Sequence, residues 1–206
     1  MRTILVANRK GGCGKTMVAI TLAAALAGQG AKVGLADADP QKSALRWLKQ
    51  RPDDAAPIRA VDWTGDDDLG EAPKKLDWLV IDAPGALSGE HTERLVAEAA
   101  AVLAPVLPSY FDVDSTRRFL KDVEHIKRVR KGKVGVQLIA NRVRAGRAAG
   151  RLGAFFDKLG QEPLAWISER SAYADLAEAG LSVFDKPQKL YLPIRAQWAP
   201  VMAALA

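Results

Sequence analysis

The sequence predicts a single α/β domain in which a doubly wound, mostly parallel sheet is flanked by helices. Short apolar or β-branched runs alternate with helical segments along the whole chain, as in proteins built from βαβ units. A glycine-rich loop joins the first apolar run to the first helix. The 206 residues, 49% of them hydrophobic, are enough for one substantial core. Because no repeat, linker or low-complexity tract divides them, we expect one domain over residues 1–206.

The expected strands are short runs that carry apolar residues on both faces. This is the pattern of parallel strands that are buried between helical layers. Several of these runs stop at a residue that favours a turn or binds a ligand, such as Asp82 or Pro108. In chain order the expected strands are residues 3–8, 31–36, 58–61, 76–82, 100–107, 134–140 and 164–167.

The expected helices lie between these strands. In one of them Phe119, Val123 and Ile126 share an inner face at i, i+4 and i+7, with Asp114 or Ser115 as its N-cap. The acidic stretch 65–71 is expected to be a surface loop or a short helix. In chain order the expected helices are residues 17–24, a segment around 44–48, 114–130, the basic segment 147–159, one or two short helices, and a terminal helix near 194–205.

The segment Lys10-Gly-Gly-Cys-Gly-Lys-Thr16 is predicted to bind phosphate. A strand, a glycine loop and a helix in this order allow the backbone N–H groups and the positive helix end to face an anion. Lys15 is expected to contact the β- and γ-phosphates, and the Thr16 hydroxyl to ligate Mg²⁺. The expected nucleotide-binding residues of the loop are Lys10, Gly11, Gly12, Cys13, Gly14, Lys15, Thr16 and Met17.

Two residues of the loop depart from simple expectation. The general pattern G-x-x-x-x-G-K-[ST] calls for glycine at position 9, where this chain has Arg9 followed by the additional Lys10. Cys13 is the only cysteine, which excludes an internal disulfide and suits a reducing cytoplasm. Of the two alternatives for Cys13, a redox-sensitive thiol or a small loop residue that offers its backbone N–H, the second is favoured.

The order Lys-Gly-Gly-x-Gly-Lys-Thr resembles the deviant Walker A motif of the ParA/MinD superfamily of P-loop NTPases. The resemblance implies that Lys10 reaches across a dimer interface to the partner's nucleotide and that Lys10 and Lys15 are both catalytic. Nearly the whole chain is similar to the short ParA-type ATPases, which segregate plasmids or position cytoplasmic cargo. Met17 departs from the threonine common there in the family. There is no room before the loop for a helix-turn-helix domain, so operator binding is not expected.

Aspartates follow two of the strands, at the edge where open α/β sheets bind ligands. Asp82 ends a hydrophobic strand downstream of the phosphate loop, which is the Walker B arrangement and predicts a Mg²⁺ ligand. Asp37-Ala-Asp39-Pro-Gln-Lys-Ser43 resembles the D-x-D-P-Q-x-S switch of ParA proteins. The resemblance implies that Asp39 orients or activates the attacking water and that Asp37 supports the Mg²⁺ shell. The alternative for this segment is a helix entry with no catalytic part.

Two further motifs are similar to family features. Asn141-Arg142 after a strand resembles the adenine-recognition step, since an asparagine amide offers both a donor and an acceptor to the base edge. The turn from Pro108 to Asp112 resembles the P-x-x-x-D turn of short ParA-type ATPases, which lies near the nucleotide and the dimer interface.

The net charge of +6 is unevenly distributed. Residues 117–158 hold thirteen Lys/Arg and three Asp/Glu, an excess of +10, whereas the rest of the chain is at −4. Such a concentration marks either a polyanion-binding face or a solvated helix surface. The candidate DNA-binding residues are Arg144, Arg147, Arg151, Arg170 and Arg195, with Arg142 as a residue that can serve the nucleotide or the dimer instead.

Taken with the resemblance, these features imply an ATP-dependent dimerisation switch. ATP and Mg²⁺ would form the homodimer, the dimer would bind DNA of the nucleoid without sequence preference, and slow hydrolysis, stimulated by a ParB-like or adaptor protein, would release it. The expected localisation is cytoplasmic and nucleoid-associated, with no membrane partner.

Three alternatives are weaker. A MinD-like membrane cycle calls for a C-terminal amphipathic helix with a basic face, which residues 198–206 lack. An iron–sulfur carrier would need several cysteines. A dethiobiotin-synthetase-like enzyme would need a substrate pocket with no visible counterpart here.

Overall fold

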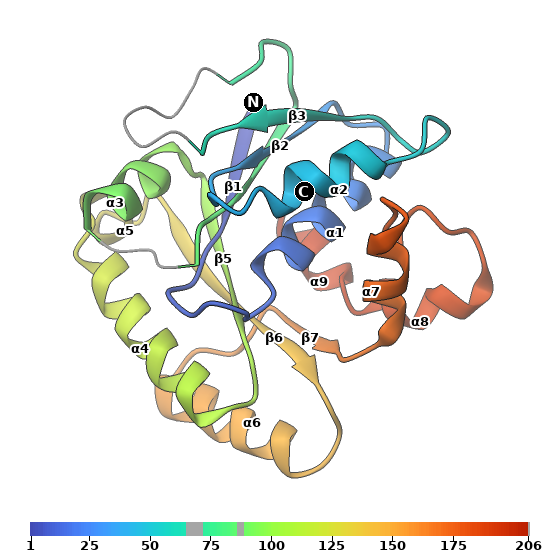
Figure 1. Ribbon diagram of the computed structural model, residues 1–206. Helices are drawn as coiled ribbons and strands as arrows, with labels where there is room; N and C mark the ends of the chain where they lie inside the picture. The colour runs from blue at the N-terminus through green and yellow to red at the C-terminus, as the bar shows by residue number, and fades with distance from the viewer. Residues whose placement is uncertain (65–71, 86–88, 206) are drawn as a thin grey trace.

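A computed structural model describes residues 1–64, 72–85 and 89–205. The predicted loop or short helix at 65–71 lies outside the described residues. The described strands form one seven-stranded sheet of order β3-β2-β4-β1-β5-β6-β7, with every neighbouring pair parallel (Figure 1). The predicted fold class is confirmed. The strands are β1 (Arg2–Val6), β2 (Val33–Asp37), β3 (Ile58–Asp62), β4 (Trp78–Asp82), β5 (Ala101–Val106), β6 (Gly135–Val143) and β7 (Ala165–Ser168).

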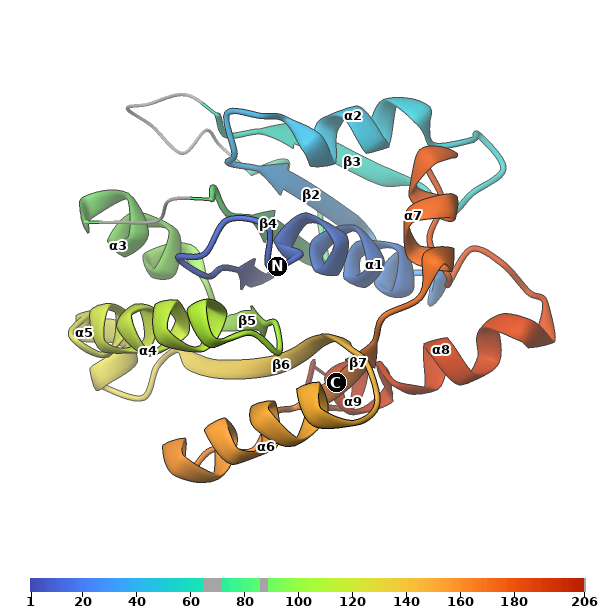
Figure 2. The same ribbon diagram turned by 60° about the horizontal axis from the view of Figure 1, so that its bottom comes forward.

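Helices cover both faces of the sheet and bury one hydrophobic cluster on each. One cluster packs the sheet against α3, α4 and α6, and the other packs it against α1, α2 and α9 (Figures 1 and 2). The described helices are α1 (Lys15–Gly28), α2 (Ser43–Gln50), α3 (Gly89–Glu98), α4 (Tyr110–Glu124), α5 (Lys127–Arg130), α6 (Arg147–Leu159), α7 (Ser171–Glu178), α8 (Leu192–Ala196) and α9 (Ala199–Leu205), with a 3₁₀ turn at Lys189–Tyr191.

The structure corrects the predicted helix over residues 114–130. Its N-cap is Ser109, whose side chain accepts a hydrogen bond from the backbone N–H of Asp112, and not Asp114 or Ser115. The helix therefore begins with Tyr110, inside the segment predicted as a turn. It ends at Glu124, and the short α5 follows.

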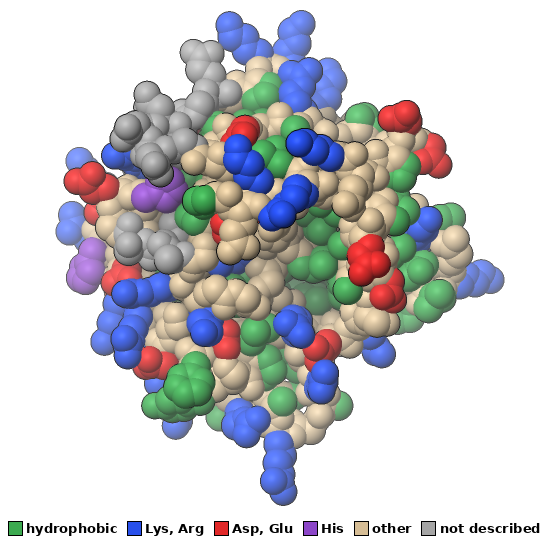
Figure 3. Space-filling view, in the orientation of Figure 1, with side chains coloured by type: hydrophobic (Ala, Val, Ile, Leu, Met, Phe, Trp, Pro, Cys, Tyr) green, Lys and Arg blue, Asp and Glu red, His purple; other side chains and the backbone are tan. Residues whose placement is uncertain are grey.

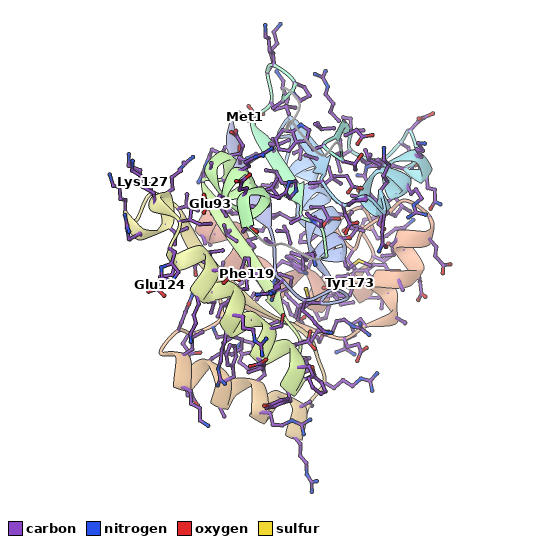
Figure 4. All side chains as sticks on the ribbon, turned by 60° about the vertical axis from the view of Figure 1, so that its left-hand side comes forward. Met1, Glu93, Phe119, Glu124, Lys127 and Tyr173 are labelled. Atoms are coloured by element: carbon purple, nitrogen blue, oxygen red, sulfur yellow. The ribbon has the colours of Figure 1, made fainter. Side chains whose placement is uncertain are left out.

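The inner face of α4 agrees with the prediction. Phe119 and Val123 are each 1% exposed, and Ile126 just beyond the helix is 9% exposed. Figure 4 shows Phe119 on the side of α4 that faces the sheet, whereas Glu124 at the end of α4 and Lys127 on the following α5 project outward.

Two other helical regions differ from the prediction. Helix α3 was not predicted, because only Thr92, Leu95 and Val96 are buried in a ten-residue helix that is otherwise polar or small. The predicted terminal helix is divided into α8 and α9, with Gln197 and Trp198 between them. In contrast, α6 has the predicted bounds.

Sheet register places the chemically important residues side by side. In the β1–β4 ladder Val6 lies opposite Asp82, and in the β2–β4 ladder Asp37 lies opposite Asp82. The loop that follows β1 and the two aspartates thus share the carboxyl edge of three adjacent strands. No helix among the described residues is long and apolar enough to span a membrane.

Candidate nucleotide-binding site

The glycine loop connects β1 to α1 at the carboxyl edge of the sheet. Gly12 and Gly14 have φ angles of +78° and +91°, a region that favours glycine. A Cβ at Gly14 would also lie 2.5 Å from the side-chain nitrogen of Asn141. The helix that follows has no acidic residue in its first turn, so its positive end is free to face an anion.

The buried side chain of Asn8 holds the start of the loop by hydrogen bonds. This residue is 0% exposed, and its side-chain N–H₂ donates to the Pro105 carbonyl and the Thr116 hydroxyl, each at 2.9 Å. Its side-chain oxygen accepts from the backbone N–H of Lys10 at 3.5 Å. The loop is therefore tied to both β5 and α4.

The two lysines of the loop differ in their surroundings. Lys15 is 6% exposed, and its Nζ donates to the backbone carbonyl of Lys10 at 3.1 Å. Lys10 is half-buried and forms no ion pair with any described residue. It lines a cavity of about 780 Å³ together with Gly11, Asp39 and Gly85.

Cys13 is buried, and burial raises the pKa of its thiol, with the nearby Asp112 carboxylate adding to the rise and Lys15 opposing it. A thiol that is both buried and protonated is unreactive. Its backbone carbonyl accepts a hydrogen bond from Asn141 at 2.9 Å. The structure thus favours the prediction of a small loop residue over that of a redox-sensitive thiol.

Asp82 is the chemically distinctive carboxylate of the site. It is 0% exposed, and neither of its oxygens has a hydrogen-bond partner among the described residues. Its pKa is raised to about 7, mainly by burial, with the neighbouring Asp37 and Asp39 adding to the rise and Thr16 and Lys15 opposing it. A buried carboxylate without a partner is costly, so it requires a proton or a cation.

This arrangement fits Mg²⁺. The described residues contain no cluster of three or more His, Cys, Asp or Glu that could hold a metal by themselves. Mg²⁺ is typically bound through one or two carboxylates together with water and substrate phosphates, so such a cluster is not needed. Asp82 and the Thr16 hydroxyl would supply the protein ligands, and the bound cation would neutralise phosphate charge.

Asp37 holds the segment that leads into α2. It is 0% exposed, and its two carboxylate oxygens accept from the backbone N–H groups of Asp39 and Leu45, each at 3.0 Å. Burial raises its pKa, and these backbone N–H groups lower it. Asp39 is half-buried, and one of its oxygens accepts from the N–H of Gln41 at 2.9 Å. The predicted switch is therefore a hydrogen-bonded turn beside the loop.

A second pocket, of about 640 Å³, opens on the other side of the loop. Gly14, Met17 and Asn141 contribute to its lining, as does Tyr173 of α7. Arg142 adopts a left-handed φ of +51° at an irregularity of the β6–β7 ladder. A pocket that adjoins the loop and is lined by the Asn141 amide has the position and the chemistry for a nucleobase.

Glu169, just after β7, lines the same pocket and was not predicted. Its carboxylate forms ion pairs with Arg142 at 2.8 Å and with Arg144, and these two arginines lower its pKa. Nothing local in the sequence indicates this role, because 27 residues separate Glu169 from Arg142. Asn8 was also missed, although a polar residue directly after the first strand was a usable signal.

The remaining predicted residues are dispersed. Arg144 and Arg170 line the pocket beside Asn141, whereas Arg147 and Arg151 are exposed on α6. Arg195 is half-buried in α8. The structure therefore does not gather all five candidate DNA-binding arginines on one helix.

Pro108 and Asp112 lie at the start of α4. Asp112 is 6% exposed, and the Ser109 hydroxyl donates to one of its oxygens. Its carboxylate adds to the rise in the pKa of the Cys13 thiol in the loop.

Comparisons with known proteins agree with this geometry. Residues 4–183 match the family model described as the CobQ/CobB/MinD/ParA nucleotide binding domain. Over 188 residues the chain is 31% identical to the "Maintenance of carboxysome distribution protein A" of Halothiobacillus neapolitanus, covering 88% of this chain and 86% of that protein. It is 31% identical to the chromosome-partitioning ATPase Soj of Thermus thermophilus over 158 residues, covering 62% of this chain and 63% of that protein.

Solved structures show the same fold. The apo McdA of Cyanothece superposes with a TM-score of 0.81 at 20% sequence identity, covering all of both chains. A putative plasmid partition protein of Borrelia burgdorferi bound to AMPPNP superposes with a TM-score of 0.76 at 20% identity, covering 98% of this chain and 99% of that one.

Proposed function

Because the chain belongs to the CobQ/CobB/MinD/ParA nucleotide-binding family, we propose that it is a switch that dimerises with ATP and dissociates after hydrolysis. It is a ParA/MinD-type protein of the class that positions or partitions cellular cargo, and ATP with Mg²⁺ is its cofactor pair. The observation that carries the proposal is the second lysine of the loop. Lys10 faces a cavity shared with Asp39, and it has no ion pair among the described residues.

Each residue would have a distinct role. Lys15, released from the Lys10 carbonyl, would contact the β- and γ-phosphates of its own subunit, and Lys10 would contact the phosphates of the partner subunit. Asp39 would orient the attacking water from the same cavity. Asn141 and Arg142 would bind the base, with Met17 beside it. Thr16 and Asp82 would hold the Mg²⁺. Asp37 would support the Mg²⁺ site by holding the switch segment, residues 37–43, through its hydrogen bonds to backbone N–H groups.

We extend the proposal to DNA of the nucleoid. Arg147 and Arg151 are exposed in the first two turns of α6, which begins at the carboxyl edge of the sheet. Dimerisation at this edge would double the number of cations that contact phosphates, so that binding would be strong only with ATP and would decrease steeply with salt. Arg144, Arg170 and Arg195 are further candidates. A ParB-like or adaptor protein would stimulate a slow intrinsic hydrolysis.

Size-exclusion chromatography with ATP and with ADP tests the switch. The wild-type protein should be a monomer with ADP, and an Asp39→Ala protein should remain a dimer with ATP because hydrolysis is impaired. A Lys10→Ala protein should bind ATP in a fluorescence titration and still be a monomer. Arg9→Ala is the matched control, since Arg9 already pairs with Asp122 at 3.2 Å. If Lys10→Ala dimerises as the wild type does, the proposed mechanism is wrong.

A further inference from the structure

Two aromatic rings at the start of α4 are unusually exposed. Tyr110 is 78% and Phe111 74% exposed, the highest values among the large hydrophobic side chains of the described residues. Their ring centroids are 5.6 Å apart in an edge-to-face arrangement. Exposed aromatic pairs are costly in water and are enriched at the centres of protein–protein interfaces.

The rings border a groove of about 640 Å³ between the start of α4 and α6. Figures 1 and 2 both show these helices as neighbours, and Figure 3 shows hydrophobic side chains beside Lys and Arg at the lower left of the molecule. Val113 and Ala154 provide apolar surface in the groove, above the buried side chains of Leu152 and Phe155. The site therefore combines an apolar floor with two aromatic anchors.

The rim of the groove is positive. Arg117, Arg151 and Lys158 line it, and the guanidinium of Arg117 lies 5.5 Å from the centre of the Phe155 ring. Asp114 also lines the groove, and its carboxylate is already paired with Arg118 at 2.9 Å. A ligand with negative charges and an apolar side chain would complement this groove in both respects.

Two other occupants fit less well. Duplex DNA is bound through its phosphates, and its stacked bases would leave the exposed aromatic rings without a partner. A second copy that met this groove across a two-fold axis would place the same cations against each other, and like charges at an interface are costly. The groove is thus better suited to a protein segment of opposite charge.

We propose that the α4–α6 groove is the docking site for an acidic peptide segment of the hydrolysis-stimulating partner, anchored by an aromatic or aliphatic side chain. This inference rests on the proposed function, which requires such a partner. Apolar burial against Tyr110 and Phe111 supplies the affinity, and the cations of the rim select for acidic residues.

Hydrogen bonds connect the groove to the phosphate loop. Ser109 binds Asp112 at the start of α4, and the Thr116 hydroxyl donates to the Asp112 carbonyl at 2.8 Å. That same hydroxyl accepts from Asn8, whose oxygen accepts from the N–H of Lys10. A peptide that shifts the first turn of α4 therefore acts on the residues that hold the loop.

Peptide selection tests the chemistry of the occupant. The full chain, biotinylated, is screened against a random 12-residue phage library, with parallel selection on a Tyr110→Ala/Phe111→Ala protein. Because both rings are exposed, this variant should keep the wild-type circular dichroism spectrum and unfolding midpoint. Peptides enriched on the wild type alone should be acidic and contain a large apolar residue. Enrichment of basic or uncharged peptides, or equal enrichment on both proteins, would overturn the proposal.

Charge reversal then tests the rim. A selected acidic peptide, labelled with fluorescein, should bind an Arg117→Glu/Lys158→Glu protein at least about tenfold more weakly in fluorescence anisotropy. The matched control, Lys186→Glu/Lys189→Glu, makes the same charge change outside the groove and should bind as the wild type does. Equal affinity for all three proteins would contradict the assignment.

The other occupants are decided by the same aromatic variant. Loss of the ATP-dependent dimer would assign the rings to the interface between copies, and loss of duplex affinity in a gel shift would assign them to nucleic acid; either result overturns the proposal. Peptide binding is measured without nucleotide or DNA, so it is independent of the switch. Binding that does not accelerate ATP hydrolysis by the wild type would refute the role as the site of the stimulating partner.

Discussion

Asp82 determines how the stability of the metal-free protein depends on pH. A carboxyl whose pKa is raised from 3.8 to about 7 in the folded state holds a proton there that the unfolded chain has already released. Folding stability from this residue is therefore greatest below about pH 4 and is lost as the pH rises to about 7. At about 1.4 kcal/mol per unit, the full loss is on the order of 4 kcal/mol.

Removing the charge should reverse this loss. Without Mg²⁺ and nucleotide, Asp82→Asn should stabilise the protein at pH 8 by about 1–3 kcal/mol, because the unmet hydrogen bonds of the buried amide offset part of the gain. The advantage should shrink toward pH 5. Urea unfolding of both proteins across this range measures it. Asp37, whose pKa is also raised, is present in both proteins, so its titration cancels in the comparison. A stability difference that does not change with pH would therefore contradict the assignment to Asp82.

Position 14 requires glycine for two reasons, its backbone conformation and its close contact with Asn141. Alanine there would be strained at a φ of +91°, and its Cβ would displace the Asn141 side chain from 2.5 Å. We expect Gly14→Ala to lower the free energy of unfolding by about 1–3 kcal/mol and to weaken nucleotide binding. Gly11→Ala is the control for stability, because nothing lies within 4 Å of its added Cβ. Equal unfolding midpoints for the two variants would refute this account.

At the scale of the elements, α2 is anchored at both ends. Asp37 accepts the N–H of Leu45 in its first turn, and Arg51 follows its last residue. Arg51 forms a bidentate ion pair with Asp185 at 2.6 and 3.0 Å, and the two side chains are only 6% and 5% exposed. Arg51 also donates to the carbonyls of Ala56 and Gly180. The switch helix is thereby joined to the segment that follows α7.

Breaking this ion pair should be costly. Arg51→Ala would leave the Asp185 carboxylate buried without its cation, which typically costs about 3–5 kcal/mol. The surface pair of Arg118 and Asp114 is the control, because an exposed i,i+4 pair contributes less than about 0.5 kcal/mol. Thermal unfolding of Arg51→Ala and Arg118→Ala compares the two directly. Similar losses would show that Asp185 finds another partner.

The elements differ in how far the sequence predicts them. Helix α6 was predicted at its exact bounds, since its basic, periodic sequence begins after a glycine and ends before Gly160. The predicted start of α4 is wrong because Ser109, with Asp112 three residues later, caps the helix instead of belonging to a turn. Both signals are local, but the pattern at Ser109 is compatible with a turn as well as with a helix cap.

For the whole molecule, the fold separates a charge cluster that is continuous in the sequence. The basic residues of α5 and the turn after it precede β6, at the amino edge of the sheet, whereas Arg147 and Arg151 follow β6, at the carboxyl edge. The excess of +10 over residues 117–158 is therefore not one surface. Arg147 and Arg151 lie at the edge of the phosphate loop, and the basic residues of α5 lie at the opposite edge.

This division gives a matched test of DNA binding. Arg147→Glu/Arg151→Glu should reduce affinity for duplex DNA in a low-salt gel shift with ATP by at least about tenfold, and should lower the dependence on salt, because each phosphate contact contributes about 0.9 to the log–log slope. Lys127→Glu/Lys131→Glu makes the same charge change at the amino edge and should bind nearly as the wild type does. ATP binding should be intact in both. Retained affinity in the first variant would remove α6 from the proposal.

The parts of the site that could be predicted are those that adjoin one another in sequence. The loop and the two aspartates each follow a recognisable strand, and parallel register alone brings them together. The partners of Asn8 and the pairing of Glu169 with two arginines could not be predicted, because they depend on which side chains meet across distant strands. The same holds for the Tyr110–Phe111 groove, whose second wall is a helix about 40 residues further along the chain.

The central place of β1 also has a consequence for biosynthesis. The loop leaves the ribosome well before Asn141, which packs against it and follows Cys13 by 128 residues. At about 5–20 residues per second, the ribosome needs roughly 6–25 s to make that interval. For most of this time neither neighbour of β1 in the sheet, β4 or β5, has been made. The apolar residues of β1 must therefore be shielded from water by other contacts. The nascent chain should therefore acquire nucleotide binding late and in one step, rather than as the loop emerges.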